Sequence, residues 1–171
     1  MLKLSPRLEL IYSHLLPGVP VWDFCCDHGY IGLKAYESGL FPEIHLIDRV
    51  PHLIAAAQQR FEEHVIEKEE VEIHFHALAG EDLLLKVTGN VIVAGVGALT
   101  TLEILEGLLK RGHLCGERLL FVPQKDVEQL EEALMQWDNF MEHYTLEDTV
   151  MFREKQRLRK LLIFRRKIAI L

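Results

Sequence analysis

The sequence has no long hydrophobic run, and no apolar stretch reaches the ~18 residues that a membrane-spanning helix requires. Its first residues, 1–6, have neither a long apolar core nor a small-residue cleavage site, so they do not form a secretory signal. Only three residues are cysteine, and two of them, Cys25 and Cys26, are adjacent. An odd count with a vicinal pair is a poor disulfide framework and indicates a reducing compartment. We therefore expect a cytoplasmic protein with no membrane partner.

The sequence also lacks internal repeats, low-complexity segments and any stretch with the composition of a linker. At 171 residues, of which 49% are hydrophobic, the chain is long enough to bury one substantial core. We expect a single domain over residues 1–171, and nothing in the sequence indicates an oligomeric state.

Positive charge is scarce outside the C-terminal end. The formal net charge of −7 argues against indiscriminate nucleic-acid binding, yet residues 151–171 hold eight basic side chains and one acidic one. Two interpretations of this basic C-terminal hairpin stay open. Either one edge of the protein contacts a polyanion, or the charges keep exposed strands from pairing with other chains.

Short apolar runs alternate with amphipathic segments along the chain. Helical spacing of apolar residues, proline starts and glycine stops predict helices, while the uninterrupted apolar runs predict strands. Helices are expected from Ser5 to the Leu16-Pro17-Gly18 stop and at Ile31–Ser38, Pro51–His64, Leu99–Lys110 and Asp126–Met135. Strands are expected at Val19–Phe24, Ile44–Ile47, Val71–Leu78, Val91–Ala94 and Leu119–Val122, with a closing antiparallel pair at Phe140–Leu146 and Leu158–Phe164. Glu67–Glu72 is expected to be an acidic surface loop.

This alternation predicts an α/β fold with a parallel sheet and right-handed crossovers. In such a three-layer, Rossmann-like arrangement, ligands bind outside the carboxyl ends of the strands. Four strand ends should therefore converge on one site: Asp23–Gly32, Asp48-Arg49, Leu78–Asp82 and Gly95–Gly97. The glycines at 80 and 95 can bring the backbone close to a ligand. Asp48 follows the first turn by about 20 residues, the spacing expected of a carboxylate that accepts hydrogen bonds from ribose hydroxyls. The alternative is a solvated acid at the end of a strand.

The first strand ends in a turn that is typical of a nucleotide-cofactor site but lacks the pattern that binds a pyrophosphate. The residues from Cys25 to Gly32 follow the pattern C-x-D-x-G-x-x-G rather than G-x-G-x-x-G. Asp27 then lies where a pyrophosphate would otherwise sit, and its carboxylate repels one. The turn therefore disfavours NAD and FAD and favours S-adenosylmethionine, whose sulfonium and ammonium groups are cationic.

Three segments carry a family resemblance. Leu4–Leu8 is similar to a leucine-serine-x-arginine-leucine opening, and Asp23–Tyr30 to an aspartate-x-glycine-serine-aspartate-histidine-alanine-tyrosine motif. Ala94–Ala98 looks like an alanine-glycine-methionine-glycine-glycine run. All three motifs are those of the bacterial tRNA (adenine-22-N1) methyltransferase family, which the chain resembles over nearly its whole length.

The resemblance implies a class I methyltransferase fold with seven strands, the last antiparallel, and S-adenosylmethionine as cofactor. It implies that Asp27 is the catalytic carboxylate, which accepts the hydrogen bond or the proton of the exocyclic amine while adenine N1 attacks the methyl group. Cofactor-binding residues are expected at Asp23, Cys25, Gly29, Asp48, Arg49, Ala79, Gly80, Gly95 and Val96. Substrate contacts are expected at His28, Tyr30, Gly97 and Gln124, with a structural hydrogen bond as the alternative for His28. The implied partner is tRNA, contacted through the basic hairpin 151–171.

Several positions depart from the family pattern. Cys25 and Ala98 replace glycines, Leu78-Ala79 replaces a glycine or acid followed by asparagine or aspartate, and Val122-Pro123-Gln124 replaces a glutamine-proline-asparagine run. The chain is also expected to lack the C-terminal helical coiled-coil extension that the family carries for tRNA. These departures keep two further hypotheses open. One is a cofactor-binding module that has lost turnover, and the other is a methyltransferase of a small molecule or a protein.

A metal site is not expected. His74 and His76 lie two residues apart on one face of a predicted strand and could share a metal, but the sequence places no third ligand beside them. The run from Cys25 to His28 resembles a zinc cluster in composition alone, because neighbouring residues cannot all point at one ion.

Overall fold

The computed structural model describes residues 2–64 and 70–169. Its helices are α1 (Pro6–Ser13), α2 (Tyr30–Ser38), α3 (Pro51–His64), α4 (Ala98–Lys110), α5 (Val127–Gln136) and α6 (Asp138–His143), with a 3₁₀ turn η1 (Gly80–Asp82). Its strands are β1 (Val21–Phe24), β2 (Glu43–Asp48), β3 (Glu72–Ala77), β4 (Asn90–Ala94), β5 (Arg118–Val122), β6 (Tyr144–Glu154) and β7 (Arg157–Arg166). Every helix in this described part of the chain is too short or too polar to cross a bilayer.

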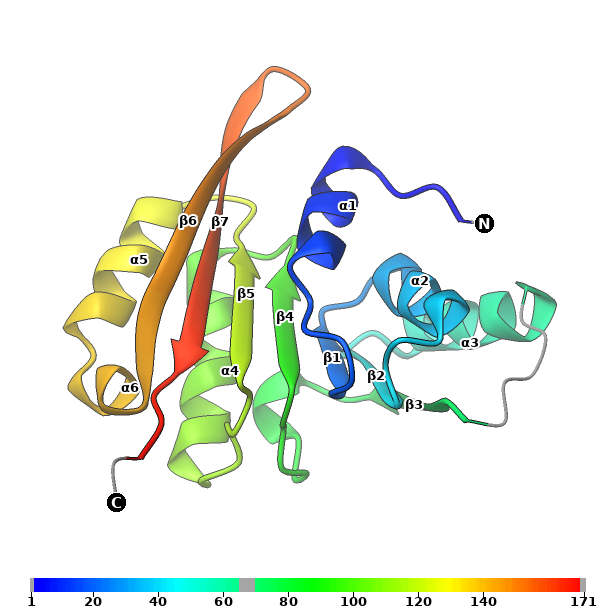
Figure 1. The fold of residues 1–171 in the computed structure, drawn as a ribbon, viewed down its shortest axis with the longest axis horizontal. Coiled ribbons are helices and arrows are strands. Elements are labelled where there is room, and N and C mark those ends of the chain that lie inside the picture. Colours follow the sequence, from blue (N-terminus) through cyan, green and yellow to red (C-terminus); the bar gives the residue numbers. More distant parts are fainter. Residues whose placement is uncertain (1, 65–69, 170–171) are drawn as a thin grey trace.

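The seven strands form one sheet in the order β3-β2-β1-β4-β5-β7-β6 (Figure 1). Strands β1 to β5 pair in parallel, whereas β7 runs antiparallel to both β5 and β6. This arrangement confirms the predicted Rossmann-like α/β fold with an antiparallel last strand. The order also reverses between β1 and β4, which places the predicted ligand-binding edge at the carboxyl ends of these two strands.

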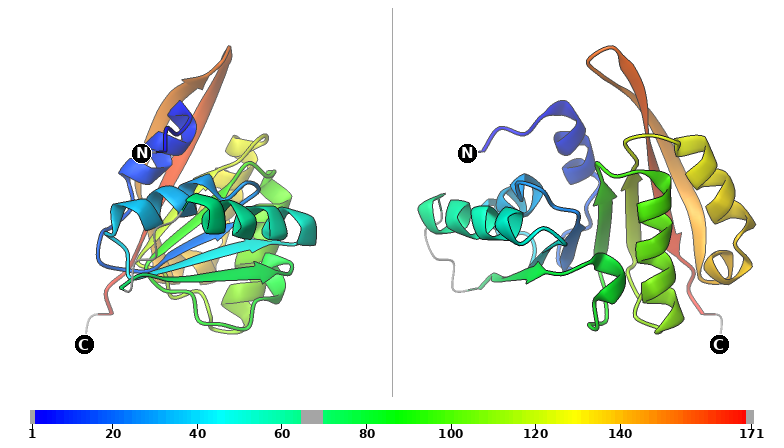
Figure 2. Two further views of the ribbon diagram at one scale, coloured as in Figure 1. Left: turned by 90° about the vertical axis from the view of Figure 1, so that its right-hand side faces the viewer. Right: turned by 180° about the vertical axis from the view of Figure 1, so that it is seen from behind.

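The core has two layers, one on each face of the sheet (Figure 2). Helices α1, α2 and α3 pack on one face, and α4, α5 and α6 pack on the other. Within β4, Val91 and Val93 point to the α4 side while Ile92 points to the α2 side, and all three are fully buried. An uninterrupted apolar strand is therefore the pattern that a central strand covered on both faces requires.

One element prediction was wrong. Residues 140–143, expected to begin a strand, form the helix α6, and β6 begins only at Tyr144. Phe140 and Tyr144 are both fully buried, and their rings stack with centroids 5.0 Å apart. One helical turn brings two aromatic residues spaced by four onto the same side, so the core takes up both rings without a strand. Of the predicted acidic loop Glu67–Glu72, residues 67–69 lie outside the described residues, and Glu72 already belongs to β3.

The β6–β7 hairpin is much longer than the strands beside it. Strand β5 pairs with β7 only from Leu162 to Arg165, whereas β6 pairs with β7 as far as Glu154 and Arg157. The tip of the hairpin therefore extends past the carboxyl end of β5 and rises beside α1 (Figure 1). This places the basic segment at the same edge of the sheet as the predicted ligand site.

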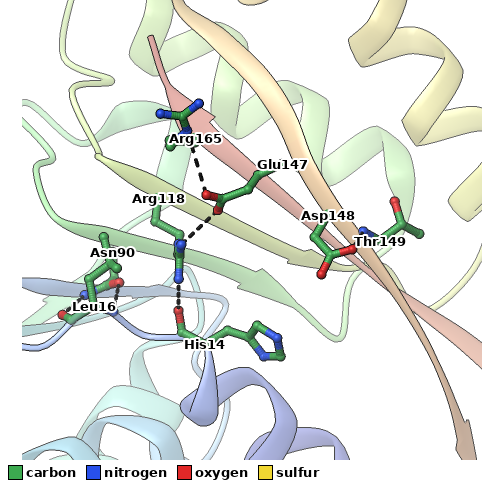
Figure 3. A network of polar contacts seen from close by, with 8 residues as sticks. All are labelled: His14, Leu16, Asn90, Arg118, Glu147, Asp148, Thr149 and Arg165. Atoms are coloured by element: carbon green, nitrogen blue, oxygen red, sulfur yellow. Dashed lines mark hydrogen bonds and ion pairs between the residues drawn. The ribbon is translucent and has the colours of Figure 1, made fainter. Parts of the chain in front are cut away.

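Polar side chains at the opposite edge fix the connection between α1 and β1 (Figure 3). Asn90 is fully buried, and its side chain accepts from the Leu16 amide at 2.7 Å and donates to the Leu16 carbonyl at 2.9 Å. Arg118 donates to the carbonyl of His14 at 2.9 Å and to the carboxylate of Glu147 at 2.8 Å. These contacts join the starts of β4 and β5 to the end of α1, so the opposite end of α1 is held over the carboxyl ends of the strands.

Replacing Asn90 with alanine should lower the free energy of unfolding by about 2–3 kcal/mol, because the amide and carbonyl of Leu16 would be buried without partners. Urea denaturation followed by circular dichroism measures the loss. Asn139, which is exposed on α6, provides the matched control, and Asn139→Ala should change the stability by less than about 0.5 kcal/mol. Equal losses in the two variants would contradict this role for Asn90.

Candidate functional site

A cavity of about 690 Å³ opens at the carboxyl ends of β1, β2, β4 and β5. It brings together most of the predicted site residues: Asp23, Cys25, Asp27, His28, Tyr30, Asp48, Gly95, Val96 and Gln124. Its wall also contains Lys3, Leu4, Ser5, Arg7, Leu8, Cys26, Ile31, Leu53 and Ala94. Segments far apart in the sequence therefore meet at the edge that the alternation of strands and helices predicts.

The turn between β1 and α2 owes its shape to left-handed backbone conformations. Cys25, Asp27 and Gly29 have φ angles of 59°, 49° and 69°. A Cβ at Gly29 would lie 3.1 Å from a methyl group of Leu46, so glycine serves both the conformation and the packing there. A glycine at 25, as the family resemblance expects, would suit this conformation, and Cys25 adopts it at a cost of about 1 kcal/mol.

Asp48 holds this turn against the end of β2. Its carboxylate accepts the amide of Asp27 at 3.2 Å and the amide of Val50 at 3.0 Å. The neighbouring Cys26 amide donates to the carbonyl of Ile47 at 3.1 Å. The predicted ribose-binding acid is thus also a structural residue, because it accepts hydrogen bonds from the backbone on which Asp27 lies.

The carboxyl group of Asp23 has an unusual environment. Asp23 is 3% exposed, and no donor in the described residues forms a hydrogen bond with its side chain. Burial, followed by the charges of Asp48 and Asp27, raises the pKa of this carboxyl to about 8. Burial likewise raises the pKa of the Cys25 thiol to about 12, so this cysteine remains a neutral thiol at physiological pH. The inner wall of the cavity therefore favours a ligand that brings positive charge.

Asp27 and His28 lie at the exposed lip of the cavity. Their side chains are more than half exposed, with the His28 Nε2 atom 3.6 Å from the Asp27 carboxylate. The rings of His28 and Tyr30 are 5.6 Å apart. Arg60, from α3, lies 4.7 Å above the Tyr30 ring and donates to the His28 carbonyl at 2.9 Å. The lip thus presents one carboxylate beside two flat rings, and Arg60 stabilises their arrangement.

No sequence pattern distinguishes Arg60, which is one of several charged residues on an ordinary amphipathic helix. The N-terminal wall of the cavity, residues 3–8, was also missed as part of the site, although the family resemblance of Leu4–Leu8 is a signal for it. Arg7 pairs with Glu154 of the hairpin at 3.3 Å, and Glu154 also pairs with Arg159 at 3.1 Å. Arg159 in turn donates to the carbonyl of Gln124. This chain of contacts connects α1, the hairpin and the end of β5 around the cavity.

Five predicted site residues do not line the cavity: Gly29, Arg49, Ala79, Gly80 and Gly97. Gly80 is buried, and a Cβ there would lie 2.8 Å from the Phe24 ring and 3.0 Å from Ile104. Glycine at this position therefore allows η1 to pack closely on β1 and α4. The Gly97 carbonyl accepts from both the amide and the hydroxyl of Thr101, at 3.2 and 3.1 Å, and so begins α4.

A second cluster of polar side chains lies on β2 and β3, away from this cavity. The donor atoms of Glu43, His45 and His74 are all within 4.8 Å of one another, a spacing that could hold a metal ion. His45 stacks on Trp22 with ring centroids 3.5 Å apart. Burial, then His74 and His76, lowers the pKa of His45 to about 3, so its imidazole is neutral at physiological pH. The two histidines of β3 stand out in the sequence by their spacing, whereas their neighbours on β2 do not.

Changing Asp23 to asparagine should reveal the buried carboxyl through the pH dependence of stability. Its pKa is about 8 in the folded chain and 3.8 in the unfolded chain, so between these values only the folded state keeps the proton. Stability contributed by Asp23 is therefore lost as the pH rises, by up to about 1.4 kcal/mol per pH unit. In urea denaturation of the ligand-free protein, the free energy of unfolding of Asp23→Asn should rise relative to that of the wild type between about pH 5 and about pH 8. The exposed Asp138→Asn control should show no such gain, and an Asp23→Asn difference that is independent of pH would refute the assignment.

Comparison with known proteins identifies the family. The family model for the methyltransferase domain matches residues 4–162. The structure is similar to a Streptococcus pneumoniae protein described as a candidate tRNA (m1A22) methyltransferase, with a TM-score of 0.81 and 22% identity over 99% of this chain and 73% of that one. It is also similar to the B. subtilis m1A22 tRNA methyltransferase TrmK (TM-score 0.79, 21% identity, 96% of this chain and 67% of that one).

A third similar structure is M. capricolum TrmK in complex with S-adenosyl-homocysteine, with a TM-score of 0.72 and 17% identity over 95% of this chain and 68% of that one. A search of curated proteins finds no match. These likenesses concern the fold, and they agree with the α/β sheet described above. Because the family model covers nearly the whole sequence, the chain belongs to the methyltransferase domain family.

Proposed function

We propose that residues 1–171 act as one domain, an S-adenosylmethionine-dependent methyltransferase that modifies N1 of adenine in tRNA. The observation that carries the proposal is the position of Asp27, an exposed carboxylate at the lip of a cavity whose inner wall is acidic. Support also comes from the similar B. subtilis protein, described as an m1A22 tRNA methyltransferase.

The residues of the cavity fit the cofactor. A volume of about 690 Å³ lies within the usual range for small-molecule sites. The buried Asp23 carboxyl lacks a partner among the described residues and would gain one in an ammonium group, while Asp48 lies where ribose hydroxyls are expected. Gly95 has a φ of 77°, and apart from its chain neighbours no described residue has an atom within 4 Å of where its Cβ would be, so the backbone is open to a ligand there. When bound, the cofactor supplies an electrophilic methyl group on its sulfonium.

The lip residues would act on the adenine. In the proposed reaction the N1 lone pair would attack the methyl carbon, the N–C bond would form as the S–C bond breaks, and positive charge would develop on the ring. The Asp27 carboxylate accepts a hydrogen bond from the exocyclic amine and stabilises that charge. His28 and Tyr30 offer flat surfaces beside the base, and the contacts from Arg60 keep them in place. Holding the two reacting atoms in line supplies much of the remaining acceleration.

A second candidate is a cofactor-binding module without turnover, and Cys25 is the observation that favours it. Its side chain enters the turn in a left-handed conformation, at the position where the family resemblance expects glycine. This candidate predicts that S-adenosylhomocysteine binds, while the wild-type protein transfers no methyl group to tRNA.

Changing Asp27 to asparagine should reduce methyl transfer to transcribed tRNA by about 100-fold or more, because the amide carries no charge to stabilise the adenine cation. The affinity for S-adenosylhomocysteine, measured by calorimetry, should stay within about threefold of the wild type, because Asp27 is at the lip rather than in the inner wall. Radiolabelled methyl transfer measures the rate, with Asp138→Asn as the control. Transfer undiminished in Asp27→Asn would refute the catalytic role, and no transfer by the wild type would favour the binding module.

We further propose that the basic hairpin contacts the tRNA backbone. Arg153, Lys155 and Arg157 are exposed near its tip, and none of them has an ion pair within the part of the chain that the structure describes. The tip extends past the sheet at the edge where the cavity opens (Figure 1). These three cations have no ion-pair partner in the described chain and can therefore bind phosphates of the tRNA backbone. The phosphates would be those on either side of a base held in the cavity.

Replacing Arg153, Lys155 and Arg157 together with alanine should weaken tRNA binding. Each lost phosphate contact reduces the number of released counterions, so the plot of log affinity against log salt should become shallower by about 2–3 units. Fluorescence anisotropy with labelled tRNA at several salt concentrations gives the slope. The control is Lys86→Ala with Lys110→Ala, which removes two exposed lysines near the opposite edge of the sheet instead of three cations at the tip, and it should leave the slope nearly unchanged. An equal change in both variants would indicate only the effect of net charge.

A further inference from the structure

Strands β2 and β3 place two carboxylates and two imidazoles on one face of the sheet. In the parallel register, Glu43 lies beside Glu72 and His45 beside His74. Residues two apart on a strand share a face, so all four side chains point to the same side. The side chain of His45 is 3% exposed, whereas those of Glu43, His74 and Glu72 are 39%, 41% and 76% exposed. The group is thus anchored by one buried ring and open to solvent at its outer side.

The donor atoms converge without completing a hydrogen-bond network. His45 Nε2 lies 2.7 Å from Oε1 of Glu43, and His74 Nε2 lies 3.6 Å from the same oxygen. His74 Nε2 is also 3.4 Å from the Glu72 carboxylate. This nitrogen is buried, yet it makes no hydrogen bond within the described residues. Two carboxylates therefore face an imidazole nitrogen that binds neither of them.

Two of the three measured spacings between donor atoms match those of a tetrahedral zinc site. Bonds of about 2.0–2.2 Å to nitrogen and oxygen separate neighbouring ligands by roughly 3.3–3.6 Å. The two distances from His74 Nε2 to the carboxylates already match, and the Glu43–His45 pair needs to open by less than about 1 Å.

The imidazole of His45 is oriented from behind as metal-bound histidines usually are. Its Nδ1 atom lies 2.9 Å from Nε2 of His76, so a hydrogen bond there directs the other nitrogen toward Glu43. The Trp22 ring stacks on His45 with an interplanar angle of 2°, which fixes the plane of the imidazole. The hydrogen bond and the stacking together hold the His45 ring in the orientation in which its free nitrogen could bind a metal ion.

We propose that Glu43, His45 and His74, whose donor atoms converge, form a site for zinc or a similar divalent transition metal, and that the exposed Glu72 carboxylate beside His74 turns in as the fourth ligand. The metal ties the edge strand β3 to β2 and is separate from the cofactor cavity, because none of these four residues lines that cavity. Nitrogen and carboxylate ligands select such ions over calcium or magnesium, which prefer oxygen alone.

Cobalt(II) is the probe for the test, because its visible absorption reports tetrahedral coordination and it quenches nearby tryptophan fluorescence. Trp137→Phe leaves Trp22, stacked on His45, as the single tryptophan reporter. Titration of this full-length protein should saturate at one equivalent, quench Trp22 and produce visible bands without a thiolate charge-transfer band. Excess zinc should reverse all three signals.

Two variants on the exposed side keep the test independent of folding. Glu43→Gln and His74→Ala, each in the Trp137→Phe background, should weaken cobalt binding at least tenfold. His52→Ala, which removes an exposed histidine on α3, should leave it unchanged. Circular dichroism verifies that each variant is folded. Absence of cobalt binding, a thiolate band that disappears in Cys25→Ser, or equal affinities in His74→Ala and His52→Ala would each overturn the proposal.

Discussion

The site depends on the Asp23 carboxyl group, which is buried at the end of β1 without a hydrogen-bond partner among the residues that the structure describes. Burial of Asp23 beside Asp48 and Asp27 makes its charged form expensive, and the folded chain responds by holding the proton up to a pKa of about 8. A cation that enters the cavity removes this penalty, whereas a pyrophosphate would increase it. Under the proposed function, the buried Asp23 beside Asp48 would therefore favour a sulfonium cofactor over NAD, and the ligand-free protein is less stable because this carboxyl group is buried.

The rest of the fold holds this acidic wall in place from two edges. At the amino ends of the strands, Asn90 and Arg118 fix the end of α1, and its beginning then forms one wall of the cavity. At the carboxyl ends, Glu154 pairs with Arg7 and Arg159, which connects the hairpin to the same wall. A tRNA bound along the hairpin would thus contact an element that is already joined to the site.

The fold and much of the site could be predicted because both depend on local patterns. Apolar runs ending in an acid or a glycine give the strand ends, and the sheet topology brings those ends together. The sequence does not distinguish a helix from a strand at residues 140–143, because two buried aromatic residues spaced by four lie on one side of either element. The role of Gly80 could not be predicted for a similar reason: a glycine needed for packing against Ile104 looks the same in sequence as one needed by a ligand. Arg60 and the pairing of His45 with His74 depend on contacts between separate elements, which no local pattern encodes.

Calorimetric titration of the ligand-free protein with S-adenosylmethionine, in two buffers of different ionisation enthalpy near neutral pH, tests the central claim most directly. Asp23 is protonated in the free chain, so binding of the cationic cofactor should release close to one proton, and the observed enthalpy should depend on the buffer. NAD should give no saturable heat in the same buffers. Binding of NAD, or binding of S-adenosylmethionine with the same enthalpy in both buffers, would contradict the account.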